Sequence, residues 1–297
     1  MKILVTGAVG MLGIDLMERL GRGHEPVGVD LAHRTSANPD VPGLIPDNFD
    51  ILDEADIRSR VASIKPDWVI HCAAYTNVDG CEKEPDKAYT VNADGAVNVA
   101  KACWGAGAKM LYVSTDYVYD GKKREPYVET DPAGPLNVYG SSKLRGETGV
   151  LGVLPGALVV RTSWLFGLNG PNFIEAILGQ VGKKDELDVV SDQVGSPTCT
   201  QDLADALARL IEVDASGVVH VSNEGMCSWH GFAVKVLELA GAGNIKVNPI
   251  TTEKLGRPAL RPAYSVLSKD KYAGITGHRL RRWEDAVADY ICRRSGR

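Results

Sequence analysis

The feature that most constrains the fold is a glycine-rich turn near the start of the chain. An apolar segment from Lys2 to Thr6 predicts a strand, and Gly7, Gly10 and Gly13 follow it in a G-x-x-G-x-x-G pattern. Apolar residues at helical spacing then run from Met11 to Leu20. Such a turn lets the backbone approach a pyrophosphate, whose charge the free N–H groups and the positive helix end can meet. We therefore expect Gly7 and Gly10 to contact a dinucleotide; the alternative is a tight turn without a ligand.

Strand-like and helix-like segments continue to alternate through the first half of the chain. Alternation of this kind predicts an α/β fold, a Rossmann-type doubly wound parallel sheet. Further strands are expected at residues 26–30, 48–51, 68–72, 110–114 and 157–161, and helices at residues 53–64, 88–106 and 139–150.

The rhythm becomes less regular after Ser163, which indicates a second part of the molecule. We expect an NAD(P)-binding Rossmann domain over residues 1–163 and a smaller α/β substrate-binding lobe over residues 164–297. The strand-like segment 217–222 is expected to return to the main sheet, so the two parts are predicted to be interleaved. Helices in the lobe are expected at residues 173–181, 201–213 and 229–240.

Charge and composition exclude several classes of protein. The 33 Lys and Arg residues and 38 Asp and Glu residues give a net charge of −5, which provides no basic field for nucleic acid or an anionic membrane. No apolar stretch reaches the ~20 residues of a membrane span, and no secretory signal is readable at the start. The six cysteines are scattered singly, as is typical of reduced thiols. We expect a cytoplasmic protein.

The ends of the second, third and fourth strands carry candidate cofactor contacts. Asp30 is placed to accept hydrogen bonds from the adenosine ribose hydroxyls and to repel a 2′-phosphate, which favours NAD. His33 and Arg34 lie just beyond and leave NADP open. Four more residues are expected near the cofactor, of which the two alanines are equally explained by close packing: Asp50, Ile51, Ala73 and Ala74.

The strongest catalytic signal is the pair Tyr139 and Lys143. Their Y-x-x-x-K spacing places both side chains on one face of a helix. A free phenol has a pKa of about 10. A nearby ammonium and the positive nicotinamide are expected to favour the phenolate and make the tyrosine usable as a proton donor or acceptor near neutrality. Thr115 ends the fifth strand, where its hydroxyl can hydrogen-bond a reacting carbonyl oxygen. The alternative, a chance helix-face pair, is weakened by the glycine turn that precedes it.

In these motifs the chain resembles the extended short-chain dehydrogenases/reductases, and within them the members that reduce 4-keto nucleotide sugars. The resemblance implies NADH- or NADPH-dependent reduction of a nucleotide-activated 6-deoxy sugar, with dTDP-4-dehydro-L-rhamnose as the expected substrate. It covers nearly the whole chain and is carried by residues 6–13, 71–79, 114–121, 135–143, 161–167, 193–198 and 261–267.

The resemblance also implies roles for individual residues. Thr115, Tyr139 and Lys143 match the catalytic trio, while Thr115, Asp116 and Trp164 fall on substrate-contact positions. Together with the motif residues above, the expected cofactor contacts are Gly7, Gly10, Met11, Leu12, Asp30, Asp50, Ile51, Ala73, Ala74, Tyr75, Thr76, Val113, Tyr139 and Lys143.

Two other functions stay open, as do the assembly and any metal. The first alternative is a nucleotide-sugar epimerase or dehydratase on the same fold, which keeps and regenerates its NAD. The second is a noncatalytic regulatory subunit of the kind that partners methionine adenosyltransferase, against which the intact trio argues. The resemblance leaves a homodimer open; some members dimerise through a metal held by acidic side chains, and Asp15 lies at one such position, but no metal is assigned.

Overall fold

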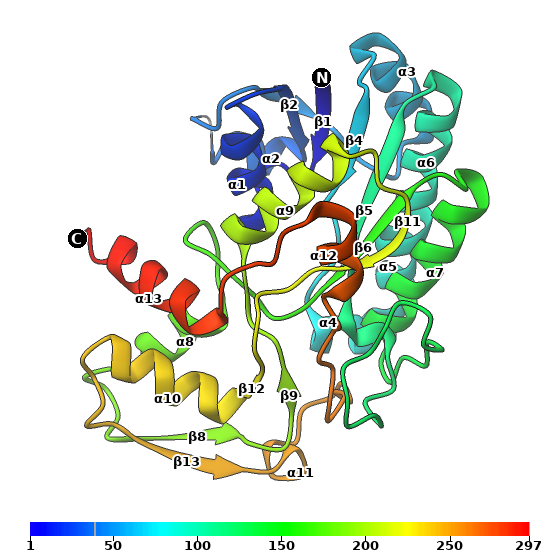
Figure 1. Ribbon diagram of the computed structural model, residues 1–297. Coiled ribbons are helices and arrows are strands. Elements are labelled where there is room, and N and C mark those ends of the chain that lie inside the picture. Colours follow the sequence, from blue (N-terminus) through cyan, green and yellow to red (C-terminus); the bar gives the residue numbers. More distant parts are fainter. Residues whose placement is uncertain (39, 297) are drawn as a thin grey trace.

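A single parallel sheet organises the molecule (Figure 1). The computed structural model describes residues 1–38 and 40–296, so Arg297, the last residue of the expected lobe, lies outside it. The sheet has seven strands in the order β11-β6-β5-β4-β1-β2-β3, and every pairing is parallel. This confirms the predicted fold class. The strands are β1 (Lys2–Thr6), β2 (Glu25–Asp30), β3 (Leu44–Asn48), β4 (Trp68–His71), β5 (Lys109–Thr115), β6 (Leu158–Thr162) and β11 (Gly217–His220).

Both faces of the sheet are covered by helices, which explains why its strands are apolar on both sides. Ile3 and Val5 pack with the first-face helices, whereas Leu4 between them packs with the second. All three side chains are fully buried, and each such burial stabilises the fold by about 1.5–3 kcal/mol. The first face is covered by α1 (Met11–Leu20), α9 (Thr200–Glu212) and α12 (Asp270–Thr276), and the second by α3 (Glu54–Ile64), α6 (Gly95–Ala106) and α7 (Val138–Val153).

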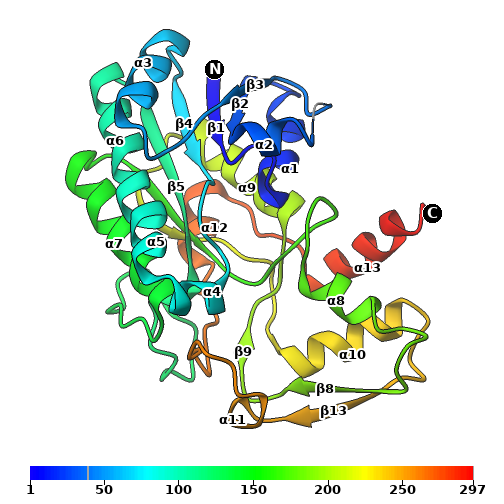
Figure 2. The ribbon, with the colours of Figure 1, turned by 180° about the vertical axis from the view of Figure 1, so that it is seen from behind.

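A smaller lobe lies beyond the carboxyl ends of the strands, at the lower end of the sheet in Figures 1 and 2. Its core is rich in aromatic rings, including Phe166, Phe232, Trp283 and Tyr290. The lobe contains α8 (Phe173–Leu178), α10 (Trp229–Leu239), α11 (Thr252–Leu255), α13 (Trp283–Arg294) and the strands β7 (Leu165–Phe166), β8 (Glu186–Val190), β9 (Val194–Gly195), β10 (Thr198–Cys199), β12 (Cys227–Ser228) and β13 (Lys246–Ile250).

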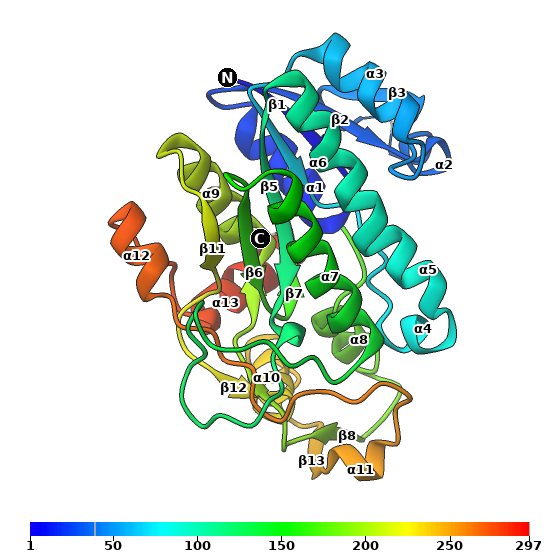
Figure 3. The same ribbon diagram turned by 90° about the vertical axis from the view of Figure 1, so that its right-hand side faces the viewer.

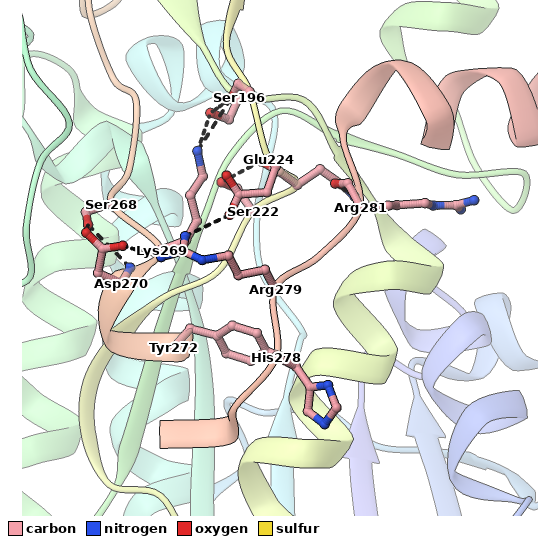
Figure 4. Close-up of polar contacts among 12 residues, drawn as sticks. Ser196, Ser222, Glu224, Ser268, Lys269, Asp270, Tyr272, His278, Arg279 and Arg281 are labelled. Carbon is pink, nitrogen blue, oxygen red and sulfur yellow. Dashed lines mark hydrogen bonds and ion pairs between the residues drawn. The ribbon is translucent and has the colours of Figure 1, made fainter. Parts of the chain in front are cut away.

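The chain passes between the sheet and the lobe several times. It leaves after β6, returns as α9 and β11, leaves again for α10, and comes back as α12. The prediction that residues 217–222 return to the main sheet is confirmed by the β11–β6 pairing. Segment 268–282 is tied down by ion pairs of Arg279 with Glu224 (3.1 Å) and Asp270 (2.6 Å), and Lys269 lies 3.4 Å from the Ser196 hydroxyl (Figure 4). The division at residue 163 stays a prediction.

Two elements differ from the sequence expectation. The third strand runs from Leu44 to Asn48 and not from 48 to 51, because Phe49 only touches the sheet by donating its N–H to the Asp30 carbonyl before the chain turns into α3. The helix expected at 88–106 is three pieces: α5 (Pro85–Tyr89), the π-helix η1 (Thr90–Asp94) and α6. The π segment places Asn92 so that its amide bridges Tyr75 and Ser142.

The remaining helices are α2 (Ala32–Thr35), α4 (Val78–Lys83) and the short 3-10 helix η2 (Asp116–Val118). Among the residues that the structure describes, every helix is too short or too polar to cross a bilayer.

Candidate active site

A cavity of about 610 Å³ opens at the carboxyl ends of β1, β4, β5 and β6, where the sheet meets the lobe. Ligands of open parallel sheets bind at this edge, because the strand ends and helix N-termini meet there. The structure gathers most of the residues singled out from the sequence on the wall of this cavity: Gly7, Gly10, Met11, Leu12, Ala73, Ala74, Thr76, Val113, Thr115, Asp116, Tyr139, Lys143 and Trp164.

The glycine turn forms one end of the cavity and has the geometry that a pyrophosphate needs. Gly7 has a φ of +72°, and a Cβ there would lie 2.7 Å from the Ala73 nitrogen. At Gly13 a Cβ would overlap the Gly7 carbonyl oxygen, so this glycine permits the contact of α1 with the turn. Gly10 is the N-cap of α1 and offers no side chain to the first helical N–H groups. Those donors and the positive helix end are therefore available to an anion, and the residues fit a dinucleotide.

Asp30 lies behind the turn, whereas Arg34 lies on the cavity wall. The buried Asp30 carboxylate accepts hydrogen bonds from the N–H groups of Val9 (3.2 Å) and Leu31 (2.9 Å). The Arg34 guanidinium lies 3.6 Å from the same carboxylate. His33 is exposed and does not line the cavity. Asp30 thus holds the glycine turn, and the nearest cation to the cavity at this end is Arg34.

Three other expected cofactor contacts do not line the cavity: Asp50, Ile51 and Tyr75. Asp50 accepts a hydrogen bond from the Leu52 N–H (2.9 Å). Ile51 is buried in the core that α3 and α6 share. The Tyr75 N–H binds Asn92 (2.7 Å) and its hydroxyl donates to a glutamate of α4–α5. These contacts give all three residues structural roles. Their roles in cofactor binding remain predictions.

Tyr139 and Lys143 lie one turn apart on α7, which begins directly after its N-cap residue, Asn137. The Asn137 carboxamide accepts a hydrogen bond from the Gly140 N–H (2.7 Å), which fixes the first turn. Thr115 ends β5 beside them and donates its hydroxyl to Asp116 (3.1 Å). The three predicted catalytic side chains therefore share one cavity, although Thr115 and Tyr139 are 24 positions apart in the chain.

Burial shifts the protonation of these groups. Removal of its hydroxyl from water raises the pKa of Tyr139, although hydrogen bonding with Thr115 partly opposes this. Burial also lowers the pKa of Lys143 to about 7. In the protein alone both charged forms lose solvation, so burial opposes the pairing of a Lys143 ammonium with a Tyr139 phenolate. The joint effect of Lys143 and a bound nicotinamide on the phenolate stays a prediction. Tyr139 is a neutral phenol at pH 7 and can donate a proton.

Asp116 adds a second group that titrates near neutrality. The residue is 2 % exposed, and burial raises the pKa of its carboxyl group to about 7. Hydrogen bonds with Ser265 and Thr115 lower this pKa but only partly offset the effect of burial. Within the part of the chain that the structure describes, its Oδ2 atom has no hydrogen-bond partner. A buried oxygen of this kind at a cavity wall is suited to bind a hydroxyl group of a ligand.

The lobe contributes an aromatic wall, of which the sequence indicated only one member. The indoles of Trp164 and Trp229 stack with 3.6 Å between their centroids, and Phe173 packs on the second at 4.6 Å. Trp164 has a φ of +48°, a strained conformation for a residue with a large side chain. A Cβ at Gly195 would lie 2.5 Å from its ring. Sequence reasoning missed Trp229, since an aromatic residue at a helix start carries no signal of a partner 65 positions away.

Asp15 lies outside this cavity. It is buried between α1 and α9 and accepts hydrogen bonds from Thr200 and Asn169. Burial raises the pKa of its carboxyl group. No group of three His, Cys, Asp or Glu side chains suited to a metal occurs in residues 1–38 and 40–296.

The chain is similar to known proteins over almost its full length. Residues 1–295 match the RmlD substrate binding domain. A dTDP-4-dehydrorhamnose reductase of Streptomyces griseus is 41% identical, over 99% of this chain and 95% of that protein. The crystal structure of a dTDP-4-dehydrorhamnose reductase from Clostridium acetobutylicum superposes with a TM-score of 0.90 at 39% identity, covering 99% of this chain and 100% of the other. That of the Bacillus anthracis reductase in complex with NADP gives 0.88 at 38% identity, covering 98% and 99%.

Proposed function

The chain belongs to the RmlD substrate binding domain family, and from this premise we propose that it is an NAD(P)H-dependent oxidoreductase, a dTDP-4-dehydrorhamnose reductase that converts dTDP-4-dehydro-L-rhamnose to dTDP-L-rhamnose. The observation that carries this proposal is the convergence of a phenol, an ammonium and a hydroxyl beside a glycine turn in one cavity. Reduction of a carbonyl group needs a proton donor at the oxygen and a bound source of hydride, and this cavity offers the first and fits the second.

The reaction adds a hydride to the C4 carbonyl carbon of the sugar and a proton to its oxygen. The reduced nicotinamide supplies the hydride when it is bound. Tyr139 gives its proton to the oxygen, and its raised pKa ensures that it holds this proton at neutral pH. The Thr115 hydroxyl donates a hydrogen bond to the same oxygen as negative charge develops there. Lys143 stabilises the phenolate that Tyr139 leaves behind until a proton from solvent restores it.

The two sides of the cavity divide the binding of the two molecules. The residues of the glycine turn, with Arg34 nearby, would hold the dinucleotide. The Trp164–Trp229 pair would pack against the sugar or the base of the substrate and exclude water from the reacting carbonyl group. Asp116 would bind a sugar hydroxyl next to the carbonyl carbon.

The proposal includes a cytoplasmic location and a homodimer. Reduced nicotinamide cofactors and nucleotide sugars meet in the cytoplasm, and the buried Cys81, Cys103 and Cys199 are free thiols. Light scattering on the purified protein would measure the mass of the assembly, for which the single chain of 31.9 kDa is the reference.

The direct test is a panel of 4-keto-6-deoxy nucleotide sugars assayed for oxidation of NADH and NADPH. We expect one reduced cofactor to be consumed for each dTDP-4-dehydro-L-rhamnose converted, with dTDP-L-rhamnose as the product. Tightly bound NAD with no net consumption would instead indicate an epimerase or a dehydratase. Absence of turnover on every sugar, together with binding to a methionine adenosyltransferase, would indicate a regulatory subunit.

A further inference from the structure

A buried ion pair lies directly behind the catalytic helix. Glu147 is on α7, one turn after Lys143, and Arg161 is on β6, which lies beside β5 and α7 (Figure 3). The two side chains are 3 % and 7 % exposed. Arg161 donates from Nε (2.9 Å) and Nη2 (2.6 Å) to the two carboxylate oxygens. Bidentate geometry of this kind fixes both groups.

The pair also contacts the strand that presents Thr115. The Ser114 hydroxyl donates to Glu147 at 2.5 Å, and Ser114 immediately precedes Thr115 on β5. One carboxylate therefore connects the helix that presents Lys143, the strand end that presents Thr115, and β6. A buried ion pair is costly to desolvate and is weak evidence for stability alone, so its position suggests a role in the site.

On its other side, the Arg161 guanidinium contacts neutral groups among the described residues. Arg161 Nη1 donates to the Tyr119 hydroxyl (2.7 Å), which lies 2.8 Å from His220 Nε2. Burial lowers the pKa of His220 to about 3, so this imidazole is neutral at pH 7. The negative charge that balances Arg161 is thus that of Glu147.

Lys143 has no close anion of its own. Among the described residues, no carboxylate lies within ion-pair distance of its Nζ, which instead lies 4.0 Å from the centre of the Tyr112 ring. Burial alone favours the neutral amine, while Glu147 opposes this and raises the pKa of Lys143. The charge on Lys143 therefore depends on a carboxylate one helical turn away.

Four other titratable groups near Lys143 are neutral at pH 7. From β4 and the residue after it, His71 has its pKa lowered to about 3 and Cys72 has its pKa raised to about 12. From β5, burial raises the pKa of Tyr112, and the same holds for Tyr139 on α7 itself. None of these four groups can replace the charge of Glu147.

We propose that Glu147 and Arg161 form a positioning pair for Lys143, in which Glu147 keeps the Lys143 amine in its charged form and Arg161 limits how strongly it does so. The inference rests on the proposed function only in that Lys143 serves the cofactor and Tyr139. Glu147 is a positioning residue, because it lies on α7 but does not line the cavity.

Nuclear magnetic resonance of the full chain with ¹³C-labelled lysine tests the proposal without cofactor or substrate. The Lys143 signal is assigned with Lys143→Arg, and its pKa is measured in each folded variant. Glu147→Gln keeps the length and removes the charge, so the pKa of Lys143 should fall by about one unit or more. Arg161→Gln leaves Glu147 unbalanced, so the pKa should rise. Glu147→Asp keeps the charge and should restore the pKa toward the wild-type value.

A double variant covers the case in which Glu147→Gln does not fold because it leaves Arg161 unpaired. Glu147→Gln/Arg161→Gln removes both charges, and Lys143 should titrate below its pKa in Arg161→Gln alone. If the pair were merely structural, the pKa of Lys143 would shift equally in all variants or would not shift in any of them. That result would overturn the proposal. The pH dependence of NADH binding should follow the same order. As the pH rises, Glu147→Gln should lose affinity for NADH at a lower pH than the wild type does, because its Lys143 amine loses its charge earlier. Absence of turnover by the wild type on any keto sugar, together with the expected order of Lys143 pKa values in the variants, would count against the proposed function and not against this pair.

Discussion

The two walls of the cavity are built in different ways. The wall from the central sheet includes backbone groups and polar side chains from strand ends and helices, such as Gly10, Thr115 and Lys143. These groups are fixed by a parallel ladder whose core side chains are fully buried. The wall from the lobe consists of large side chains, with Trp164 and Trp229 stacked on each other. The sheet wall holds charge and protons in place, whereas the lobe wall offers apolar area.

This difference predicts two kinds of response to substitution. On the sheet wall, loss of a single atom should stop the chemistry or exclude the cofactor, because position decides the function there. On the lobe wall, the effect should be graded with the area removed and should concern affinity. The four predictions below test this contrast in order of expected size.

The largest effect is expected from Tyr139→Phe, which removes only the hydroxyl from the sheet wall. Loss of the proton donor should lower kcat by about a hundredfold to ten-thousandfold while NADH binding is retained. Steady-state kinetics with the keto sugar and calorimetry with NADH measure the two quantities. Tyr117→Phe is the matched control, because this ring packs edge-on against Tyr139 at 6.0 Å and also lines the cavity, and its turnover should change by less than about tenfold. Near wild-type turnover of folded Tyr139→Phe would reject the assignment.

Gly10→Val should exclude the cofactor from the same wall. A Cβ at this position already lies 3.1 Å from the Gly7 carbonyl oxygen, so the two added methyl groups must occupy the space that the pyrophosphate needs. Overpacking costs about 1–3 kcal/mol, which corresponds to about tenfold to hundredfold weaker NADH binding in calorimetry. Gly152→Val on the outer face of α7 is the control, since no atom lies within 4 Å of its Cβ position. Unchanged NADH affinity in folded Gly10→Val would show that the turn does not bind the cofactor.

Trp229→Ala tests the lobe wall. Removing the stacked partner of Trp164 should raise KM for the nucleotide sugar by about twofold to tenfold, since an aromatic pair contributes about 0.5–1.5 kcal/mol, and kcat should change less. Trp229→Phe should lie between this variant and the wild type. Trp104→Ala serves as the control, because that indole is 67% exposed on α6. A fall in kcat as large as that of Tyr139→Phe would erase the contrast between the walls.

The smallest effect is expected at the end of the glycine turn, where we expect Asp30 to favour NADH and Arg34 to favour NADPH. NADH should be used at least as well as NADPH, and Asp30→Ala should shift the preference toward NADPH. Arg34→Ala should lower kcat/KM for NADPH by about twofold to fivefold and leave kcat/KM for NADH unchanged, because half-exposed ion pairs contribute less than about 1 kcal/mol. Ratios of kcat/KM for the two cofactors measure this preference. A hundredfold preference of the wild type for NADPH would contradict it.

Much of the sheet wall was predictable because its signals are local. The glycine spacing between a strand and a helix indicates the turn, and the four-residue spacing of Tyr139 and Lys143 places them on one helix face. Thr115 joins them because the carboxyl ends of parallel strands meet at one edge of the sheet. The third strand was misplaced, since its short pairing with β2 has an irregular register that no periodicity marks.

The lobe wall was not predictable in the same way. Trp164 was found through the family resemblance, but its stacked partner was missed, as was the Glu147–Arg161 pair behind α7. Arg34 lines the cavity and Asp30 does not, and the expected contact of Asp30 with the adenosine ribose stays a prediction. Each of these facts depends on which side chains meet across elements that are distant in the chain.

The sequence by itself determined the alternation of strands and helices, the glycine turn and the shared helix face of Tyr139 and Lys143, because periodicity and short spacings act through local backbone geometry. Only the tertiary structure decided the state of charge of those groups. Burial raises the pKa of Tyr139 and lowers that of Lys143 to about 7, in opposition to the simple pairing of an ammonium with a phenolate. Desolvation depends on all the atoms that surround a group, and those atoms come from α7, β4, β5 and β6 together.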